Sequence, residues 1–337
     1  MVRRIAWGAS WAAALAALAL CAAWLFSGSR WEVDLVANLT AQSALGAFGL
    51  AIWWLIRRRW ARMGVALAAL ALASTGVAWA PRAERGAIPS DPARLVRVLT
   101  MNAYAWSRNP AGLMSLLEAT DADVVTILEP PLELVKGMRA SPTLQAKFPH
   151  RHLPEHAEAG SRIMLSRWPA ERLRRRSLPP GTPEPAGDWR YHGRSWRIDA
   201  PSPFVLSMIH PESPRTRVRW EQGNQDIDML EHAMTHMIAP LGLPVVLAGD
   251  FNSTPTGWRS RELSRRTGLR RAKPWWAPVG TWPAWSVWPA RIAIDDVMVS
   301  PGVGVIAWEL HTPPPEGRKG VRSSDHVPVK VRLLLPE

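Results

Sequence analysis

Cysteine is almost absent from this sequence of 337 residues. Cys21 is the single cysteine, so no intramolecular disulfide can form. Lysine is also scarce, and arginine therefore supplies nearly all of the positive charge behind the formal net charge of +13. Such a charge suits nucleic acid or anionic lipid as a partner, but an arginine-rich composition fits a bias of the coding sequence equally well. No internal repeat is present, which excludes a repeat architecture.

Uncharged apolar runs dominate the beginning of the chain, at about 5–26, 35–56 and 64–80. At about 1.5 Å of rise per residue, a helix over the first run would cross a hydrocarbon core of roughly 30 Å. A cleaved signal peptide is the alternative for the first run, and a buried core helix for the short third run. The length of the first run and the two runs behind it favour transmembrane helices. We therefore predict an integral membrane anchor over residues 1–80 with three transmembrane helices.

Arginines determine the expected orientation of these helices. They precede the first run and lie between the second and third, whereas the other loop carries one arginine beside two acids. By the positive-inside rule, the N-terminus is cytoplasmic and everything after the third helix lies outside the cytoplasm. Without a third helix, the rest of the chain would return to the cytoplasm. The arginines on the cytoplasmic side are Arg3, Arg4, Arg57, Arg58, Arg59 and Arg62.

The remainder of the chain is predicted to form a linker and one large domain. Residues 81–94 are polar, rich in proline and without periodicity, which is typical of a linker. Helix-like patterns follow at 110–120 and 215–239, and strand-like patterns at 95–101, 123–128, 163–165, 189–198, 204–209, 245–248, 292–299, 303–310 and 327–334. Because strands outnumber helices, residues 95–337 are expected to form an α/β fold with packed sheets and helices outside.

Polar residues stand where these apolar strands meet loops. Ligand sites in layered α/β proteins gather at strand ends, so side chains scattered over the domain are expected to converge. Each position also has an ordinary explanation, such as a turn before Pro130 or a loop cap. The residues at strand ends are Asn102, Glu129, His210, Asp250, Asn252, Asp325 and His326.

The stretch VVLAGDFNSTP at 245–255 carries the clearest signal for chemistry. Its apolar run reads as a buried strand, and Gly249 is expected to turn the backbone so that Asp250 and Asn252 share a face at the rim. A carboxylate there can orient water, and an amide can donate to an anionic transition state. An Asx turn that closes a strand is the structural alternative.

Seven segments in a fixed order resemble the endonuclease/exonuclease/phosphatase superfamily, a group of Mg²⁺-dependent phosphodiesterases related to DNase I and exonuclease III. They are LTMNAYAW, VVTILEP, GSRIMLSRWP, MIHPE, LAGDFNSTP, IDDVMVS and SSDHVPV, within about residues 95–335. The apolar runs and TWP at 281–283 resemble a bacterial membrane-anchored branch. The resemblance implies a DNase I-like four-layer α/β sandwich, two packed β-sheets flanked by helices, as a catalytic domain outside the bacterial inner membrane.

The resemblance also implies roles for individual residues. Glu129 would bind Mg²⁺, with Mn²⁺ as an alternative ion, while Asn102 and Asp325 hold the ion or its waters. Asp250 would orient or deprotonate the attacking water.

The implied donors and substrate contacts come from further positions. Asn252 would hydrogen-bond the phosphoryl oxygens, and His210 would act toward the leaving group. His326 would donate to a non-bridging oxygen with Asp295 orienting it, although Asp296 is an open alternative to Asp295. The substrate-binding residues implied by the same motifs are Arg162 and Trp282.

Several segments have both a functional and a structural interpretation, and the sequence does not decide between them. Tyr104 and Tyr191 are the only tyrosines, and neither matches the active-site tyrosine of DNA-repair members. Three histidines, His150, His152 and His156, form a possible metal loop, but a solvated loop is favoured because no strand or helix is expected there. The arginine-rich segments 172–177 and 259–273 are consistent with phosphate binding or with a solvated surface. The tryptophan-rich segment 275–289 suits base stacking, a membrane-dipping loop or packing on the sandwich.

These observations leave two classes of function. The first is a membrane-anchored phosphodiesterase, with nuclease activity slightly ahead of a sphingomyelinase-type action on phospholipid head groups. The second is a non-catalytic membrane-anchored binding module. The complete set of acid, amide and histidine positions favours the enzyme, and no obligate protein partner is inferred.

Overall fold

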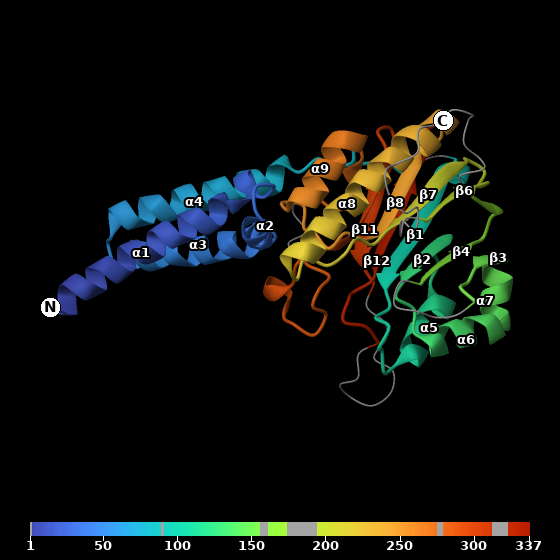
Figure 1. Ribbon diagram of the computed structural model, residues 1–337, viewed down its shortest axis with the longest axis horizontal. Helices are drawn as coiled ribbons and strands as arrows, with labels where there is room; N and C mark the ends of the chain where they lie inside the picture. The colour runs from blue at the N-terminus through green and yellow to red at the C-terminus, as the bar shows by residue number, and fades with distance from the viewer. Residues whose placement is uncertain (1, 89–90, 156–160, 174–193, 275–278, 312–322) are drawn as a thin grey trace.

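The computed structural model describes residues 2–88, 91–155, 161–173, 194–274, 279–311 and 323–337. Figure 1 shows two parts, a rod of N-terminal helices and a sandwich of sheets and helices at one end of the rod. The rod contains the helices α1 (Val2–Ala22), α2 (Trp31–Ala37), α3 (Thr40–Ile56) and α4 (Trp60–Trp79). A 3₁₀ turn at Ala23–Phe26 leads from α1 toward α2.

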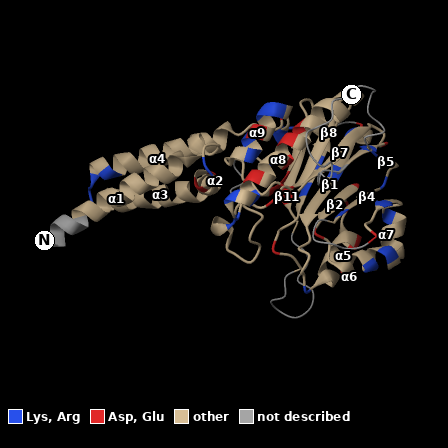
Figure 2. Cartoon of the chain, in the orientation of Figure 1, with Lys and Arg blue, Asp and Glu red and all other residues tan. Residues whose placement is uncertain are grey.

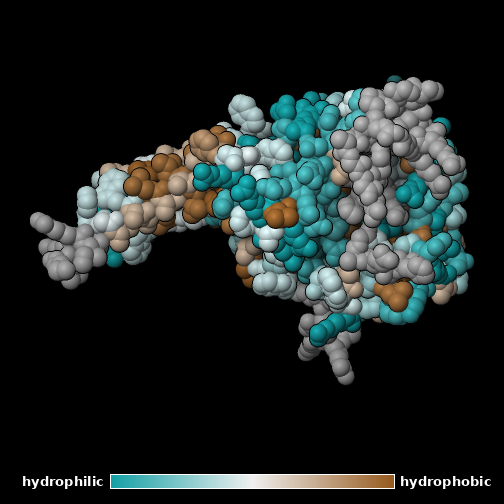
Figure 3. Space-filling view, viewed as in Figure 1, coloured by the Kyte–Doolittle hydropathy of each residue, from teal (hydrophilic) through white to brown (hydrophobic). Residues whose placement is uncertain are grey.

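Two stretches of the rod, Trp7–Phe26 and Trp60–Trp79, are long and apolar enough to cross a membrane. The pair α2 and α3 would make a third span, bent by 63° at its break. This break differs from the uninterrupted span expected at 35–56, because Asn38 ends α2 and turns its side chain toward the sandwich. The outer surface of the rod is largely apolar, in contrast to the hydrophilic surface over much of the sandwich (Figure 3).

Small side chains hold the rod together. Helices α3 and α4 lie side by side, and α1 packs against both. Alanine at a helix contact lets the backbones approach closely, so packing does not depend on large side chains. The buried residues of the rod include Ala14, Cys21, Ala47, Ala51, Trp54, Ala66, Ala69 and Ala73.

The sandwich contains two mixed six-stranded sheets. The first has the order β11-β12-β1-β2-β4-β3, with β1 Leu95–Asn102, β2 Val124–Leu128, β3 His150–His152, β4 Arg162–Ser166, β11 Gly304–Leu310 and β12 Val329–Leu334. The second has the order β5-β6-β7-β8-β10-β9, with β5 Ala170–Arg172, β6 Arg194–Ile198, β7 Phe204–Ile209, β8 Val245–Asp250, β9 Arg270–Arg271 and β10 Asp295–Val299.

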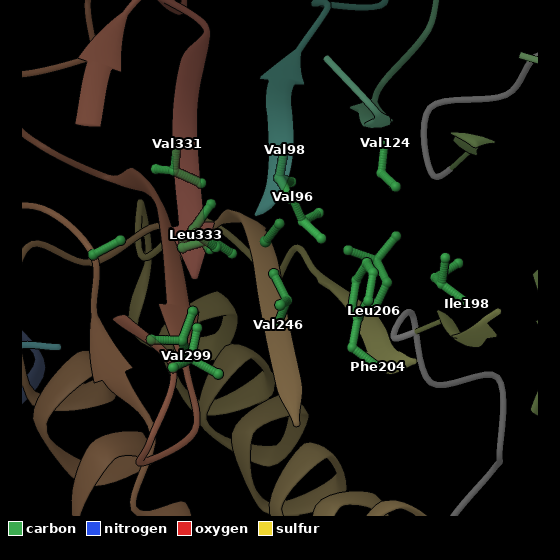
Figure 4. Packing of buried hydrophobic residues seen from close by; sticks show 14 of the residues in the cluster. Val96, Val98, Val124, Ile198, Phe204, Leu206, Val246, Val299, Val331 and Leu333 are labelled. Atoms are coloured by element: carbon green, nitrogen blue, oxygen red, sulfur yellow. The ribbon is translucent and has the colours of Figure 1, made fainter. Parts of the chain in front are cut away.

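The main core lies between the sheets, where side chains such as Val98 and Val246 face one another (Figure 4). Helices α5 (Pro110–Ala119), α6 (Leu132–Ala140) and α7 (Pro142–Lys147) cover the first sheet. Helices α8 (Arg217–Ala233) and α9 (Trp258–Thr267) cover the second. Helix α8 continues through a π-helical turn at Met234–Ile238 and a 3₁₀ turn at Ala239–Leu241. The predicted arrangement of two sheets flanked by helices is confirmed.

The segment expected to be a linker is bound to both sheets over residues 81–86. The backbone N–H of Ala83 donates to the carbonyl of Arg271 in β9, at 2.9 Å. The N–H of Gly86 donates to the carbonyl of Val305 in β11, at 3.0 Å. These backbone hydrogen bonds need no apolar pattern, which is why the sequence gives no sign of them. The segment thus connects one edge of each sheet.

Candidate active site

Strand register brings the predicted polar residues to one end of the sandwich. In the first sheet β1 and β2 are parallel, with Asn102 opposite Leu128, so that Glu129 follows directly beside Asn102. In the second sheet β7 and β8 are parallel, which places His210 beside Asp250. Asp295 at the start of β10 lies directly opposite Asp250. Side chains from both sheets therefore surround one space.

Asn102 links two of the carboxylates. Its amide Nδ2 donates to Oε1 of Glu129 at 3.1 Å and to Oδ2 of Asp250 at 3.4 Å. Its Oδ1 accepts from the backbone N–H of Tyr104 at 3.0 Å, which determines which way the amide points. The carboxylates thus face the nitrogen of Asn102 and not its oxygen, an arrangement that orients them.

Glu129 is held in its ionised form. The Nε2 of His210 lies 3.2 Å from Oε1 of Glu129 and 3.9 Å from Oδ2 of Asp250. Burial raises the pKa of Glu129, but the hydrogen bonds from His210 and Asn102 outweigh burial and lower the pKa to about 2. Glu129 therefore presents a permanent negative charge.

His326 and Asp295 form a close buried pair. The Nδ1 of His326 lies 2.8 Å from Oδ2 of Asp295, and its Nε2 faces Oδ2 of Asp250 at 3.9 Å. Burial alone would lower the pKa of His326, but the surrounding carboxylates, first of all Asp295, raise it to about 10. The backbone N–H of Asp295 donates to Oγ1 of Thr281 at 3.1 Å, which fixes the start of β10. His326 is thus an oriented imidazolium at neutral pH.

Asp296 occupies a different environment from Asp295. Its carboxylate lies 3.1 Å from the guanidinium of Arg271 and accepts from the indole Nε1 of Trp308 at 3.0 Å. Successive strand residues point to opposite faces, so only one of the two acids can face His326. The structure places Asp295 there.

Asp250 is almost completely buried. Burial, with the charge of Asp295 close by, raises the pKa of Asp250 to about 6. Its Oδ1 accepts from the backbone N–H of Asn252 at 2.7 Å. The Nδ2 of Asn252 donates to the carbonyl of Pro211 at 2.9 Å, which leaves that amide pointing along the rim of the site.

The backbone is strained at three residues of the site. Tyr104, Glu129 and Asn252 have φ angles of 59°, 47° and 46°, in the left-handed region that non-glycine residues rarely occupy. Gly249 has φ of 147° within β8, where a Cβ atom would lie 2.1 Å from the carbonyl oxygen of Ile209. The expected turn at Gly249 is therefore wrong: the strand continues to Asp250, and glycine is required by the close approach of β7.

The donor atoms at this end of the sandwich fit a hard divalent cation. Oδ1 of Asp325 is buried and accepts no hydrogen bond, while Oδ2 accepts from the indole Nε1 of Trp282 at 3.2 Å. Asp250, Asp295 and His326 also lie within 4.8 Å of one another. A protonated His326 paired with Asp295 cannot donate a lone pair, so an ion at this end of the sandwich would be held by carboxylate oxygens. Oxygen donors of this kind suit Mg²⁺.

A cleft of about 650 Å³ opens above these residues. Both residues predicted to bind substrate line it, and the Nη2 of Arg162 donates to the carbonyl of His210 at 3.4 Å. The cleft has further walls that the sequence did not suggest, namely Leu35, Asn38, Leu39, Tyr104, Trp106, Arg215 and Arg219. Three of these belong to the N-terminal helices or the turn between them, where the apolar pattern gave no sign of a role in the site.

Helix α2 and the residue that ends it are docked on the loop after β8 and on the start of α9. The carboxylate of Asp34 accepts from the backbone N–H of Trp258 at 2.8 Å. The Oδ1 of Asn38 accepts from the N–H of Thr254 at 2.6 Å. Asp34 and Asn38 are both buried, so the contact is an integral part of the fold. One wall of the cleft is therefore built by the N-terminal helices.

The other candidate segments contribute little to the site, apart from Thr281 and Trp282 of the segment 275–289. His150 and His152 belong to the edge strand β3, so the expected solvated loop is wrong, and His156 lies outside the described residues. In the segment 259–273, Arg259 and Arg271 are buried and serve the fold. In the segment 275–289, the exposed tryptophans among the described residues are Trp285 and Trp288, while 275–278 lie outside them. Most of 172–177 also lies outside the described residues.

Comparison with known proteins agrees with this geometry. The sequence model of the Endonuclease/Exonuclease/phosphatase family matches residues 99–326. Similar solved structures include a functionally unknown conserved protein from Enterococcus faecalis, with 16% identity over 70% of this chain and 98% of that chain and a TM-score of 0.51. They also include a humanized TDP2 from D. rerio, with 15% identity over 71% of this chain and 99% of that chain and a TM-score of 0.51.

A third similar structure is the beta toxin of Staphylococcus aureus, with 12% identity over 70% of this chain and 99% of that chain and a TM-score of 0.50. At these identities the likeness shows the shared fold. A search among curated protein sequences finds no match. Because the family match covers well over half of the chain and includes the polar residues described above, from Asn102 to His326, the protein belongs to the endonuclease/exonuclease/phosphatase family.

Proposed function

We propose that this protein is a membrane-anchored, divalent-metal-dependent phosphodiesterase. The observation that carries the proposal is the pair of opposed groups around one cleft: a buried carboxylate, Asp250, facing the imidazolium of His326 at 3.9 Å. Hydrolysis needs one group that accepts a proton and one that donates a proton or a hydrogen bond, and the surroundings of the two groups must give them different pKa values. The family is hydrolytic, which supports the same chemistry.

Asp250 acts as the base toward the attacking water. Its pKa, raised to about 6 by burial, leaves it ionised at neutral pH yet more basic than an exposed carboxylate. The N–H of Asn252 holds Oδ1 of Asp250, so Oδ2 is the oxygen that takes the proton. His326, kept protonated by Asp295, donates from Nε2 to a phosphoryl oxygen as negative charge grows there.

Glu129 and Asp325 hold the metal ion, Mg²⁺ or alternatively Mn²⁺. When bound, the ion neutralises charge on the phosphoryl group. Asn102 orients Glu129 and Asp250 through its Nδ2, a positioning role beside the role implied by the resemblance, in which Asn102 holds the ion or its waters. His210 lies beside Glu129 and protonates or hydrogen-bonds the leaving group. Arg162 and Trp282 contact substrate from the cleft wall.

The membrane anchor is proposed from the two or three apolar helices of the rod. Figure 2 shows basic residues at the end of the rod distant from the sandwich. The turn between α3 and α4 and the first turn of α4 contain Arg57, Arg58, Arg59 and Arg62. The positive-inside rule places that end in the cytoplasm and the sandwich outside the inner membrane of a bacterium. A reporter fused after Glu337 should therefore be active only if it functions outside the cytoplasm, and a fluorescent cytoplasmic signal would contradict this topology.

The substrate is a phosphodiester in a nucleic acid or a phospholipid. The arginine-rich composition gives nuclease activity a slight preference on sequence grounds. The wall formed by α2 favours the phospholipid as the second candidate, because it brings apolar side chains of the anchor to the cleft. A non-catalytic binding module is less well supported, since every acid and histidine needed for hydrolysis is present and oriented.

A substrate screen tests this proposal. The purified full-length protein, with Mg²⁺ or Mn²⁺, is assayed on plasmid, single-stranded DNA, RNA, phospholipid vesicles and a chromogenic phosphodiester. We expect hydrolysis of at least one natural phosphodiester and of the chromogenic compound, and loss of both activities in Asp250→Asn. Absence of hydrolysis of any of these compounds by the folded wild-type protein would overturn the proposal.

A further inference from the structure

An apolar cavity of about 350 Å³ lies between the helical rod and the sandwich. Its size falls in the range of roughly 300–1,000 Å³ that is typical of small-ligand sites. The rod contributes apolar side chains of α3 and α4, among them Ala41, Leu45 and Ala78, and the sandwich contributes Val279 and Ile292. Arg82, Lys273 and Arg291 also line the cavity, but most of the surface that faces it is hydrocarbon.

This cavity adjoins the catalytic cleft. Asn38 and Ile292 line both spaces, so they form the boundary between them. The side chain of Asn38 is held in place by the backbone N–H of Thr254, in the loop that follows Asp250. One elongated ligand could thus place a polar group beside Asp250 and an apolar tail between the helices.

The surroundings of the cavity are those of a membrane surface. Leu45 and Trp79, near the sandwich ends of α3 and α4, are exposed on the rod. On the sandwich, Trp285 and Trp288 are exposed, and the same loop is tied to α3 by a hydrogen bond of 2.7 Å from Gln42 to the carbonyl of Arg291. Tryptophan prefers the boundary between head groups and hydrocarbon. The rod wall and the sandwich wall of the cavity therefore lie at the membrane depth where the acyl chains of lipids begin.

Physical chemistry indicates what fills such a space. An apolar cavity offers water few hydrogen bonds, and an empty cavity loses dispersion contacts along its walls. In a bilayer, hydrocarbon chains are the most concentrated apolar ligand. We propose that this cavity binds one acyl chain of a membrane phospholipid whose phosphodiester lies in the catalytic cleft, so that phospholipid is the substrate class of the proposed phosphodiesterase.

The reaction on such a lipid is a hydrolysis in which atoms balance without any further reactant. The water oxygen forms a bond to phosphorus and its proton passes to Asp250. One phosphorus–oxygen ester bond breaks, and the leaving alkoxide takes a proton from the site. The products are one phosphomonoester and one alcohol. The cavity takes no part in bond making. It binds the acyl chain and so positions the phosphodiester beside Asp250.

Filling the cavity tests the inference. Ala41→Trp and Ala78→Trp each place an indole in the space, and neither residue belongs to the catalytic machinery. Ala71→Trp is the matched control, because Ala71 is also an exposed alanine of α4, about two helical turns before Ala78, and does not line the cavity. The full-length proteins are assayed on phosphatidylglycerol vesicles and on a chromogenic phosphodiester without acyl chains.

We expect Ala41→Trp and Ala78→Trp to lower kcat/KM on the vesicles by at least about tenfold, because several methylene contacts are lost, while the chromogenic activity stays within about twofold of wild type. The control should change neither activity. Equal vesicle activity in wild type and both cavity variants would overturn the inference. Cleavage of oligonucleotides without any cleavage of phosphatidylglycerol would also overturn it, although the proposed phosphodiesterase would stand.

A second measurement uses only the wild-type protein and so does not depend on the folding of a variant. Monomeric short-chain phosphatidylglycerols that differ by single methylenes are compared. We expect kcat/KM to rise by up to about fourfold per methylene until the cavity is full. A flat series would contradict chain binding. Failure of the wild-type protein on the chromogenic compound would instead overturn the proposed function itself.

Discussion

Asp34 and Trp258 join the N-terminal helices to the start of α9: the carboxylate of Asp34 accepts a hydrogen bond of 2.8 Å from the backbone N–H of Trp258. The other oxygen of Asp34 accepts from the indole Nε1 of Trp220 at 2.8 Å. A single buried carboxylate in α2 thus holds two helices of the sandwich, α8 and α9. The position of the anchor and the shape of the cleft are coupled through this contact.

Removal of this carboxylate should weaken the docking of α2. Asp34→Ala leaves two N–H donors without partners, and each unsatisfied buried donor costs about 1–3 kcal/mol. We expect a lower thermal midpoint in detergent and a higher KM for lipid, with a smaller change in kcat. Glu32→Ala is the control, because Glu32 is exposed on the same helix. An unchanged midpoint in Asp34→Ala would show that the docking contributes nothing to stability.

The pairing of His326 with Asp295 predicts a selective effect on one pKa. Asp295→Asn removes the main charge that raises the pKa of His326 to about 10, so the pKa should fall toward its ordinary value. We expect kcat to fall by about 10²–10⁴ at neutral pH. NMR titration of His326 measures the first effect directly.

Asp296→Asn is the control for that experiment. Asp296 pairs with Arg271 and lies away from His326, so its substitution should lower stability without shifting the His326 titration. Equal shifts of the His326 pKa in the two variants would contradict the assignment of Asp295 as its partner.

The pH dependence of turnover should show two limits. Asp250 must be ionised to accept a proton, and burial raises its pKa to about 6, so the rate should fall as the pH drops through about 6. His326 must be protonated to donate, and its pKa is raised to about 10, so the rate should fall as the pH rises through about 10. A chromogenic substrate measured across this range checks both limits. A rate that continues undiminished well below pH 6 would exclude Asp250 as the base.

His210 should matter most for poor leaving groups. Its Nε2 lies 3.2 Å from Oε1 of Glu129 and 3.9 Å from Oδ2 of Asp250, the oxygen that His326 also faces. His210→Ala should lower kcat strongly for an alkyl ester and only slightly for a nitrophenyl ester, since a good leaving group needs no acid. The comparison is a plot of log kcat against the pKa of the leaving alcohol. Parallel lines for wild type and variant would rule out this role.

The sequence drew attention to the acids, amides and histidines because each stands where an apolar strand meets a loop: Asn102, Glu129 and His210 come at or after the ends of strands, and Asp325 and His326 precede the last strand. Parallel pairing of β1 with β2 and of β7 with β8 then brings Asn102 beside Glu129 and His210 beside Asp250. The choice between Asp295 and Asp296 could not be made from the sequence. It depends on which face of β10 is turned toward His326, and that is set by strand register.

The contribution of the helical rod could not be predicted at all. Leu35 and Leu39 belong to an apolar run that reads as membrane span, and only the break at Asn38 turns them toward the cleft. The pairing of residues 81–86 with both sheets was missed for a related reason. Backbone hydrogen bonds and helix docking are tertiary contacts, and they leave no periodic pattern in the chain.

Metal dependence is the most direct test of the central claim that Glu129 and Asp325 hold an ion beside Asp250. Hydrolysis of the chromogenic phosphodiester by the full-length protein is measured in EDTA, then with increasing Mg²⁺, for wild type, Glu129→Gln and the control Glu133→Gln, whose side chain is exposed on α6 and pairs with Lys136. We predict no activity in EDTA, recovery with Mg²⁺ in wild type and control, and a loss of several powers of ten in Glu129→Gln. Full activity in EDTA, or a Glu129→Gln protein as active as wild type at every Mg²⁺ concentration, would contradict the account.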